Sequence, residues 1–310
     1  MKQIGLALKR AWLNGLFLYH YGTPNPRRVP LVQSEHHVHV NPQDWRARKK
    51  IIAAGIRGRY PRNQQFWREA IAAFAPDTVL DIGVNYGECL FSIIYPESTR
   101  IFGFEANPTL ESYLQSSLAE HPSASQIELA FQLVTDEDEG SEEFFIDCNW
   151  SGGSAAGLDP ENYDSNRYTR VQIPKASVDA TLENHNCIPT KLFFKIDVEG
   201  FEEKVLSGMQ RTLHMASESV GFIEFDAEML SRAETEIDVY WDFLTSEFEV
   251  FAFDRSGVPH PANRMNSSQL GELCGRHFHT DLVLIRSSDV ELGQRLLASW
   301  LPSEQERYAA

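Results

Sequence analysis

The stretch TVLDIGVNYG, residues 78–87, decides the predicted fold, because a short apolar run ends there in a glycine-rich turn. Apolar runs as short as Thr78–Ile82 are typical of buried strands. Residues 89–95 follow with a helical pattern that stops at Pro96, so we expect a strand, a turn and a helix in that order. Glycine lets the backbone approach a ligand closely, and a helix N-terminus favours negative charge. The stretch therefore predicts a ligand site at the end of a strand.

The alternation of strands and helices continues beyond this stretch. Further strands are predicted at residues 100–105, 127–134, 191–197, 220–225, 249–253 and 281–285. Helices are predicted at residues 63–75, 108–120 and 201–213. Such alternation indicates an α/β fold with a doubly wound, mostly parallel sheet, which binds ligands at the C-terminal ends of its strands. Two segments interrupt the pattern and are expected as a surface hairpin at 136–147 and a long polar loop at 149–170.

Residues 1–65 precede this pattern and are predicted as a helical N-terminal extension to a main domain at 66–310. They read as an amphipathic helix at 4–21, a proline-containing linker at 22–34, a short strand at 36–40 and a helix from Asn41 to about residue 55. One side of the first helix carries the apolar residues Leu8, Trp12, Leu13, Leu16 and Phe17. We expect this side to dock on the protein's own fold or on another subunit. Contact of residues 1–21 with a membrane surface, and disorder, are the alternatives.

Composition narrows the class of protein. The 310 residues are 42% hydrophobic and 23% charged, which is ordinary for a globular chain and excludes disorder, collagen and coiled coil as descriptions of the whole. Lys and Arg number 28 and Asp and Glu 44, a net charge of −16, so nucleic acid is disfavoured as a partner. The four cysteines lack metal-ligand spacing, and the N-terminal apolar run lacks a signal-peptide cleavage site. We therefore expect free thiols and a cytoplasmic protein.

Glu105 indicates what the glycine-rich turn binds. It ends the second predicted strand, twenty-two residues after Gly83, where a carboxylate can accept the hydroxyl protons of a ribose. A dinucleotide-binding turn would need glycine at the positions of Asn85 and Glu88, so a nicotinamide dinucleotide is disfavoured. S-adenosylmethionine fits better, because its ammonium group could meet the carboxylate or carbonyls beside Asp81 and its carboxylate the N–H groups of the loop.

Three motifs together resemble the FkbM-type branch of the class I methyltransferases. They are residues 81–87 (DIGVNYG), 104–108 (FEANP) and 195–208, which contain KIDVEGFE and VLSG. Ala106 stands where that family usually has proline. The resemblance covers roughly residues 76–226 and leaves residues 1–65 unexplained. It implies a Rossmann-like, seven-stranded sheet ending in an antiparallel C-terminal hairpin, S-adenosylmethionine as methyl donor, and O-methylation of hydroxyls, often on sugars or polyketides.

The resemblance also assigns cofactor contacts. It places the methionine part against Asp81, Gly83, Asn85 and Gly87, the ribose on Glu105, and the adenine beside Ala106 and Asn107. It places the adenine edge at the end of the third strand, against Val134, Thr135 and Asp136. Asp197 completes the expected set, because it ends the fourth strand beside the predicted sulfonium.

Asp197 and Glu199 are the candidate catalytic residues. In an extended segment, positions i and i+2 point to the same face, about 6.5–7 Å apart. An alcohol ionises far above neutral pH, so methyl transfer to it needs a base, with Asp197 as first candidate and Glu199 as second. His279 or His277, before the last strand, could also be the base. The alternative for Glu199 is structural: it could cap the next helix or pair with Lys195.

The same acids also support an alternative hypothesis, in which they form a metal site. They could hold a divalent cation that lowers the pKa of the hydroxyl, with Glu224 or Asp226 as a further ligand. For the acceptor, we expect Trp150 and the stretch Ser151–Ser154 to form a lid in which the ring gives a sugar an apolar face. Ser151, Ser154 and Glu224 are the remaining candidate acceptor contacts.

The predicted function is S-adenosylmethionine-dependent transfer of a methyl group to a hydroxyl of a saccharide or glycan-type acceptor. A polyketide or another small-molecule hydroxyl is the alternative acceptor. A different class is a binding or scaffold protein on a methyltransferase fold, which would recruit a partner through residues 1–65 without catalysis. The chain could also form a homo-oligomer.

Overall fold

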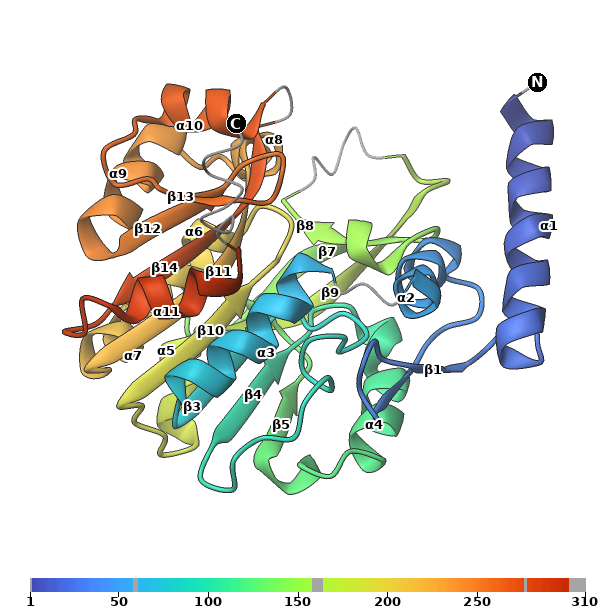
Figure 1. Ribbon diagram of the computed structural model, residues 1–310, viewed down its shortest axis with the longest axis horizontal. Helices are drawn as coiled ribbons and strands as arrows, with labels where there is room; N and C mark the ends of the chain where they lie inside the picture. Colours follow the sequence, from blue (N-terminus) through green and yellow to red (C-terminus); the bar gives the residue numbers. More distant parts are fainter. Residues whose placement is uncertain (1, 58–60, 158–163, 276–277, 301–310) are drawn as a thin grey trace.

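A large twisted sheet forms the centre of the computed structural model, which describes residues 2–57, 61–157, 164–275 and 278–300 (Figure 1). Five strands run parallel to one another: β3 (Thr78–Ile82), β4 (Arg100–Phe104), β5 (Ile127–Ala130), β10 (Lys191–Ile196) and β11 (Glu218–Asp226). Strand β14 (His279–Arg286) runs antiparallel to both β11 and β12 (Glu249–Phe253). The predicted α/β, doubly wound, mostly parallel architecture is confirmed.

The strand order is β13-β12-β14-β11-β10-β3-β4-β5, which gives eight strands where seven were expected. The additional strand is β13 (Pro259–Pro261), inside a segment that the sequence pattern left without structure. Proline has no N–H to donate to a second neighbour, so a strand with a proline at each end suits the edge of a sheet.

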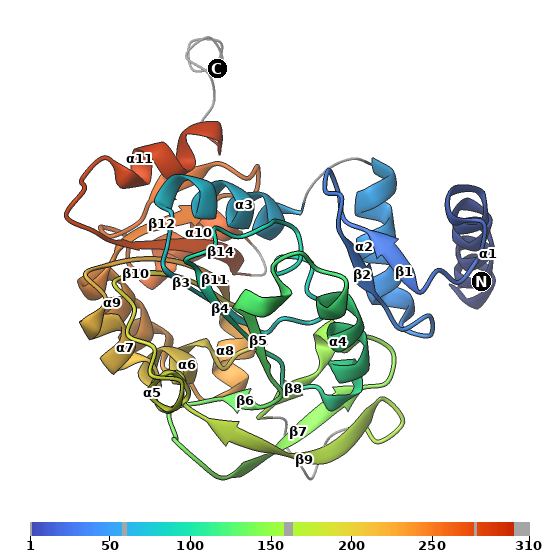
Figure 2. The ribbon, with the colours of Figure 1, turned by 90° about the horizontal axis from the view of Figure 1, so that it is seen from below.

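Neighbouring residues of the central strands enter two different cores. Phe193 belongs to the core that includes Phe66 and Trp67, while Phe194 belongs to the core on the opposite face. The first face is covered by α3 (Arg62–Phe74) and α11 (Leu292–Leu297); the other is covered by helices that include α6 (Glu202–Ser207), α7 (Gln210–Met215) and α9 (Ile237–Glu247) (Figure 2). Burial on both faces explains why these strands read as continuous apolar runs.

Two predicted helices differ in the structure. Residues 89–95 form turns, because side-chain hydroxyls take the carbonyls that a helix would use: Ser92 Oγ donates to the Cys89 carbonyl and Tyr95 Oη to the Leu90 carbonyl. The predicted helix over 201–213 is divided into α6 and α7 around Gly208, where an added Cβ would lie 2.0 Å from the Thr135 carbonyl oxygen.

A second sheet replaces the expected hairpin and most of the expected loop. Its order is β6-β9-β7-β8, with β6 (Leu133–Val134), β7 (Ser141–Asp147), β8 (Ala155–Ala156) and β9 (Tyr168–Ala176). The strand predicted over 127–134 is therefore divided, because β5 stays in the large sheet and β6 enters the small one. Only Ile173 of β9 is buried, so that strand carries little apolar signal.

The N-terminal segment contains α1 (Lys2–Tyr21), β1 (Arg28–Pro30), β2 (His37–His39) and α2 (Trp45–Arg57). Helix α2 begins later than predicted, because Asn41 closes a turn by accepting from Gln43 N. On α1, Leu13 and Phe17 are buried and Phe17 packs against Trp45, as expected for docking on the protein's own fold. Trp12 was expected on the same side but is exposed.

Strands β1 and β2 pair antiparallel. The other helices are α4 (Glu111–Ala119), α5 (Val178–Asn184), α8 (Ala227–Arg232) and α10 (Ser267–Cys274). None of the helices in the described ranges is long and apolar enough to cross a membrane.

Candidate functional site

A pocket lies at the carboxyl ends of β3, β4 and β10, where the strand order reverses between β3 and β10. Ligands of doubly wound sheets bind at such a reversal. The described residues that line it are Ile82, Gly83, Asn85, Phe104, Glu105, Ala106, Gln132, Leu133, Val134, Phe144, Ser151, Gly152, Ser154, Asp197, Val198 and Glu199. The pocket thus brings together the predicted glycine-rich turn, the ribose carboxylate, part of the lid and both predicted acids.

Gly83 fixes how closely two walls of this pocket approach each other. Its φ is +83°, and an added Cβ would lie 1.9 Å from the Asp197 carbonyl oxygen. The neighbouring contact is a backbone bond, in which Asp197 N donates to the Ile82 carbonyl at 3.0 Å. Only glycine fits both the conformation and the space. The glycine-rich turn and the acidic turn are therefore packed directly on each other.

Glu105 is buried at the end of β4 and is held by two backbone N–H groups. Asn85 N donates to one carboxylate oxygen and Asn107 N to the other, both at 2.7 Å. Burial raises the pKa of Glu105 to about 7, although the two backbone bonds act in the opposite direction. Each carboxylate oxygen has a second lone pair, so the group can still accept two hydroxyl protons from a ligand.

Lys195 is a site residue whose role the sequence did not indicate. Its Nζ lies 3.1 Å from Asp81 Oδ1, 3.0 Å from the Gly83 carbonyl oxygen and 3.6 Å from Asp197 Oδ2. Burial alone would lower the pKa of Lys195, but the charges of Asp81 and Asp197 outweigh it and raise that pKa. The pairing with Glu199 that was considered from the sequence is wrong. Asp81 does not line the pocket as described and lies behind the turn as the partner of this cation.

Three carboxylates converge beside the turn. Asp197, Glu199 and Glu224 each offer an oxygen, and these oxygens lie within 4.8 Å of one another. The chain reaches this arrangement by a tight turn rather than by the extended segment that was expected, because Glu199 has a φ of +55°. Burial, followed by the charge of Asp197, raises the pKa of Glu199 to about 8. At neutral pH the cluster therefore retains a proton.

Glu202 performs the structural task that was considered for Glu199. Its Oε1 accepts from Val198 N and Gly200 N, both at 3.2 Å, and so closes the turn that carries the acids. Burial raises the pKa of Glu202 to about 7. Within the described part of the chain, the Glu199 side chain makes no hydrogen bond or ion pair and is left to face the pocket.

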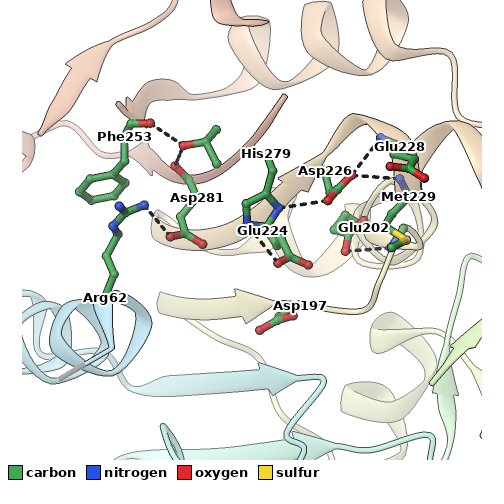
Figure 3. Close-up of polar contacts among 12 residues, drawn as sticks. Arg62, Asp197, Glu202, Glu224, Asp226, Glu228, Met229, Phe253, His279 and Asp281 are labelled. Atoms are coloured by element: carbon green, nitrogen blue, oxygen red, sulfur yellow. Dashed lines mark hydrogen bonds and ion pairs between the residues drawn. The ribbon is translucent and has the colours of Figure 1, made fainter. Parts of the chain in front are cut away.

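His279 lies beside two acids of the neighbouring strand β11, Glu224 and Asp226 (Figure 3). Its Nδ1 is 3.1 Å from Asp226 Oδ2 and its Nε2 is 3.7 Å from Glu224 Oε1. The hydrogen bond to Asp226 raises the pKa of His279, so the ring tends to hold its proton rather than accept another. Asp226 is further occupied as the cap of α8, where it accepts from Glu228 N and Met229 N. His277 lies outside the described residues.

The predicted lid rests on the glycine-rich turn and on the N-terminal segment. Ser151 Oγ donates to Asn85 Oδ1 at 2.9 Å, and Ser151 N donates to Asp44 Oδ2 at 2.9 Å. Asn107 Nδ2 donates to Ser154 Oγ at 3.4 Å. Asp44 was not anticipated, since nothing in its local sequence points to a contact more than a hundred residues away. The lid is therefore held by contacts at both of its serines.

The Trp150 ring is in contact with two cationic side chains of α2. Lys50 Nζ lies 4.5 Å and Arg46 Cζ 5.7 Å from the centre of its ring. Trp150 is outside the pocket lining as described, while Ser151, Gly152 and Ser154 are part of it. The ring is thus placed at the rim, under the side chains of α2.

The remaining predicted residues support the pocket from outside its described lining. Gly87 has a φ of +82° and lies against the Phe91 ring. Asn107 caps the short turn after β4 by accepting from Thr109 N. Thr135 accepts from Glu137 N through Oγ1, and Asp136 is exposed. Gln132, Leu133, Val134 and Phe144, of which only Val134 was anticipated, form the pocket wall at this end.

A family model described as "Methyltransferase FkbM domain" matches residues 81–249. The chain is similar to the solved structure of a methyltransferase FkbM from Methylobacillus flagellatus KT, with 17% identity and a TM-score of 0.40, over 67% of this chain and 43% of that one. It therefore spans less than half the length of that relative. No curated protein matches the chain.

Two further solved structures have similar scores. One is the O-methyltransferase TomG from Streptomyces achromogenes, involved in tomaymycin synthesis, with 11% identity and a TM-score of 0.38 over 81% of this chain and 92% of that one. The other is an O-methyltransferase from Bacillus cereus in complex with SAH, with 8% identity and a TM-score of 0.39 over 73% of this chain and 82% of that one.

Proposed function

The protein belongs to the FkbM methyltransferase family, since the family model matches more than half of the chain, and from this premise we propose that it transfers a methyl group from S-adenosylmethionine to a hydroxyl oxygen of a saccharide-type acceptor. One observation carries the proposal: a single pocket is lined by the glycine-rich turn, by Glu105 and by the acids Asp197 and Glu199. A nucleoside-recognising carboxylate and candidate bases thus share one space.

The donor site is supported by the chemistry of its walls. When bound, S-adenosylmethionine supplies an electrophilic methyl group on a positively charged sulfur. Glu105 would accept the ribose hydroxyls with the lone pairs that the backbone leaves free. Asn85 and Gly83 would line the methionine part, and the Asp197 carboxylate would place negative charge near the sulfonium.

Asp197 is the proposed general base, with Glu199 second. The hydroxyl oxygen forms its bond to the methyl carbon as the carbon–sulfur bond breaks, the sulfur keeps that electron pair, and the hydroxyl proton passes to the carboxylate. Lys195 lies 3.6 Å from Asp197 and orients it toward the pocket. Glu199, with its pKa raised to about 8, supplies the alternative at slightly alkaline pH. His279 is a weaker candidate, because Asp226 stabilises its protonated form.

The acceptor is proposed to be a saccharide because polar side chains are part of the pocket lining. Ser151 and Ser154 offer hydroxyls, and the Glu224 carboxylate lies next to the two acids. Such groups recognise several hydroxyls at once, as a sugar requires. A polyketide hydroxyl remains the alternative acceptor. Offering both saccharides and polyketides to the protein, and measuring which of them is methylated, distinguishes the two.

A divalent cation is the competing activator of the hydroxyl. The donor set fits one, because Asp197, Glu199 and Glu224 present converging carboxylate oxygens, which hard cations prefer. In that case the acids would hold the ion and the ion would lower the pKa of the acceptor. Activity that is lost on chelation and restored by magnesium would identify this route, whereas full activity in chelator favours the carboxylate base.

The binding test is calorimetric titration of the full chain with S-adenosylhomocysteine. We expect saturable binding that Glu105→Ala weakens at least tenfold and that Asp242→Asn, at an exposed acid of α9 outside the described lining, leaves unchanged. Absence of binding at millimolar ligand would overturn the proposal. Transfer is then measured by mass spectrometry with isotope-labelled donor and a panel of sugars and polyketides. Asp197→Asn is expected to lose transfer while keeping the cofactor; binding without transfer to any acceptor would favour a scaffold role.

We also propose a cellular location and a class of partner for the protein. Four free cysteines suit a reducing compartment, so we place the protein in the cytoplasm. We propose a small-molecule or glycan acceptor rather than nucleic acid, given the net charge of −16. Homo-oligomerisation is best measured by analytical ultracentrifugation.

A further inference from the structure

The charge of the chain is divided very unevenly between its two parts. Residues 1–65 contain 12 Lys and Arg and two acidic residues, a net charge of +10, whereas residues 66–310 contain 16 Lys and Arg and 42 acidic residues, a net charge of −26. Of the two acids in the first part, Asp44 is buried and hydrogen-bonded to Ser151. By sequence the N-terminal segment is therefore strongly cationic, whereas the rest of the chain is strongly anionic.

Helix α1 combines this positive charge with an exposed apolar face. Trp12 is 66%, Leu18 52% and Tyr19 83% exposed, while Leu13 and Phe17 are buried on the other side. The exposed residues include Ala11, Trp12, Gly15, Leu18 and Tyr19, which share one face at helical spacing. The sequence of α1 contains no Asp or Glu. An uncovered apolar face on such a helix indicates a partner that is both apolar and negatively charged.

The arrangement of the helices leaves this face open. Figures 1 and 2 show α1 at the edge of the molecule, beside α2 and away from the large sheet. Helix α2 adds the exposed cations Arg46, Lys49 and Lys50, of which Arg46 and Lys50 lie over Trp150 at the pocket rim. Exposed cations of the N-terminal segment thus lie on α2, beside α1, and two of them contact Trp150 next to Ser151 of the pocket lining.

We propose that α1 lies on the surface of an anionic lipid bilayer. Trp12, Leu18 and Tyr19 would enter the headgroup region, and the cations of residues 1–65 would face the lipid phosphates. Nucleic acid offers phosphates but no apolar layer to cover the exposed face, and a second α1 would bring like charges together. The negative remainder of the chain is repelled by the same bilayer, so one orientation is favoured, with the N-terminal segment toward the lipid.

The test is co-sedimentation of the full chain with vesicles, and it is independent of the proposed reaction. We expect binding to vesicles of phosphatidylcholine with phosphatidylserine, weakening as salt is raised, and little binding to phosphatidylcholine alone. The double variant Trp12→Ser/Tyr19→Ser, at exposed positions, is expected to lose at least tenfold in vesicle affinity, as is Lys9→Glu/Arg10→Glu. The matched control Val239→Ser/Val290→Ser removes two exposed apolar side chains from the anionic part and should leave binding unchanged.

Three results would overturn the inference. The first is absence of binding to anionic vesicles. The second is that the Trp12→Ser/Tyr19→Ser variant binds as tightly as the parent protein, and the third is a vesicle affinity that does not change with the phosphatidylserine content. Analytical ultracentrifugation of the same proteins supplies a further arm, because an oligomer that the Trp12→Ser/Tyr19→Ser variant dissolves would show that a second copy covers α1. Tight, salt-sensitive binding of duplex DNA without vesicle binding would identify nucleic acid instead.

Discussion

Replacing Lys195 by methionine should destabilise the protein in a pH-dependent way. The Lys195 and Asp81 side chains are 5% and 1% exposed, and their charged atoms are 3.1 Å apart. Methionine keeps most of the volume but leaves Asp81 as a buried charge without its partner. Breaking a buried pair from one side costs about 3–5 kcal/mol of unfolding free energy. The loss should be largest in alkaline buffer, where Asp81 would have to stay ionised.

The sign of the pH dependence follows from Asp81. Without Lys195 its pKa in the folded state lies far above that in the unfolded chain, so the unfolded state binds fewer protons between those two values. The unfolding free energy of Lys195→Met should therefore fall by about 1.4 kcal/mol per pH unit as pH rises above the pKa of Asp81 in the unfolded chain. Urea unfolding followed by tryptophan fluorescence at several pH values measures this directly. Adding Asp81→Asn should recover at least half of the loss; a variant as stable as the parent at pH 8, or one with a parallel pH profile, would refute the reasoning.

Three further outcomes are expected. Gly83→Ala should lower the melting temperature and weaken S-adenosylhomocysteine binding at least tenfold, because its Cβ would lie 1.9 Å from the Asp197 carbonyl oxygen at a φ of +83°; Gly15→Ala, with open space around it, is the control. S-adenosylhomocysteine affinity should rise with pH through about 7, as Glu105 ionises and gains acceptor capacity, and calorimetry of Glu105→Gln should show that this rise is gone. Glu199→Gln should stabilise the protein by about 1–3 kcal/mol at pH 8 and not at pH 4, since a carboxyl whose pKa is raised by folding costs stability only above its unfolded pKa; thermal unfolding that is unchanged at pH 8 would contradict this.

The parts of the fold that could be predicted are those whose signal is local. Phe193 and Phe194 enter opposite cores, and such two-sided burial produces the apolar runs from which the parallel strands were predicted. The helix over 89–95 could not be excluded, because the hydroxyls of Ser92 and Tyr95 replace its backbone bonds only in the folded state. Strand β9 was not predicted, because only one of its residues is buried and its sequence therefore shows no periodic apolar pattern.

The candidate site shows the same limit at the level of side chains. Glu105 and Asp197 end predicted strands, so their position at one sheet edge could be expected. Lys195 and Asp81 each interrupt an apolar strand one residue before its end, and the parallel register places them directly opposite. That shared offset is a signal that could have found the pair. The turn at Glu199 gave no such signal, because its φ of +55° depends on the contacts around it.

The side chain of Asp44 has a practical consequence for anyone who prepares this protein. Its Oδ2 accepts from Ser151 N at 2.9 Å and from Tyr86 Oη at 3.3 Å, and its Oδ1 accepts from Ala47 N at 3.0 Å. A fragment that starts near residue 66 would keep the three methyltransferase-like motifs but would lack Asp44. Ser151 and Tyr86, which lies in the glycine-rich turn, would then lose the carboxylate to which both are hydrogen-bonded. Binding and activity measured on such a fragment would therefore refer to an altered pocket. The full chain is the form to purify.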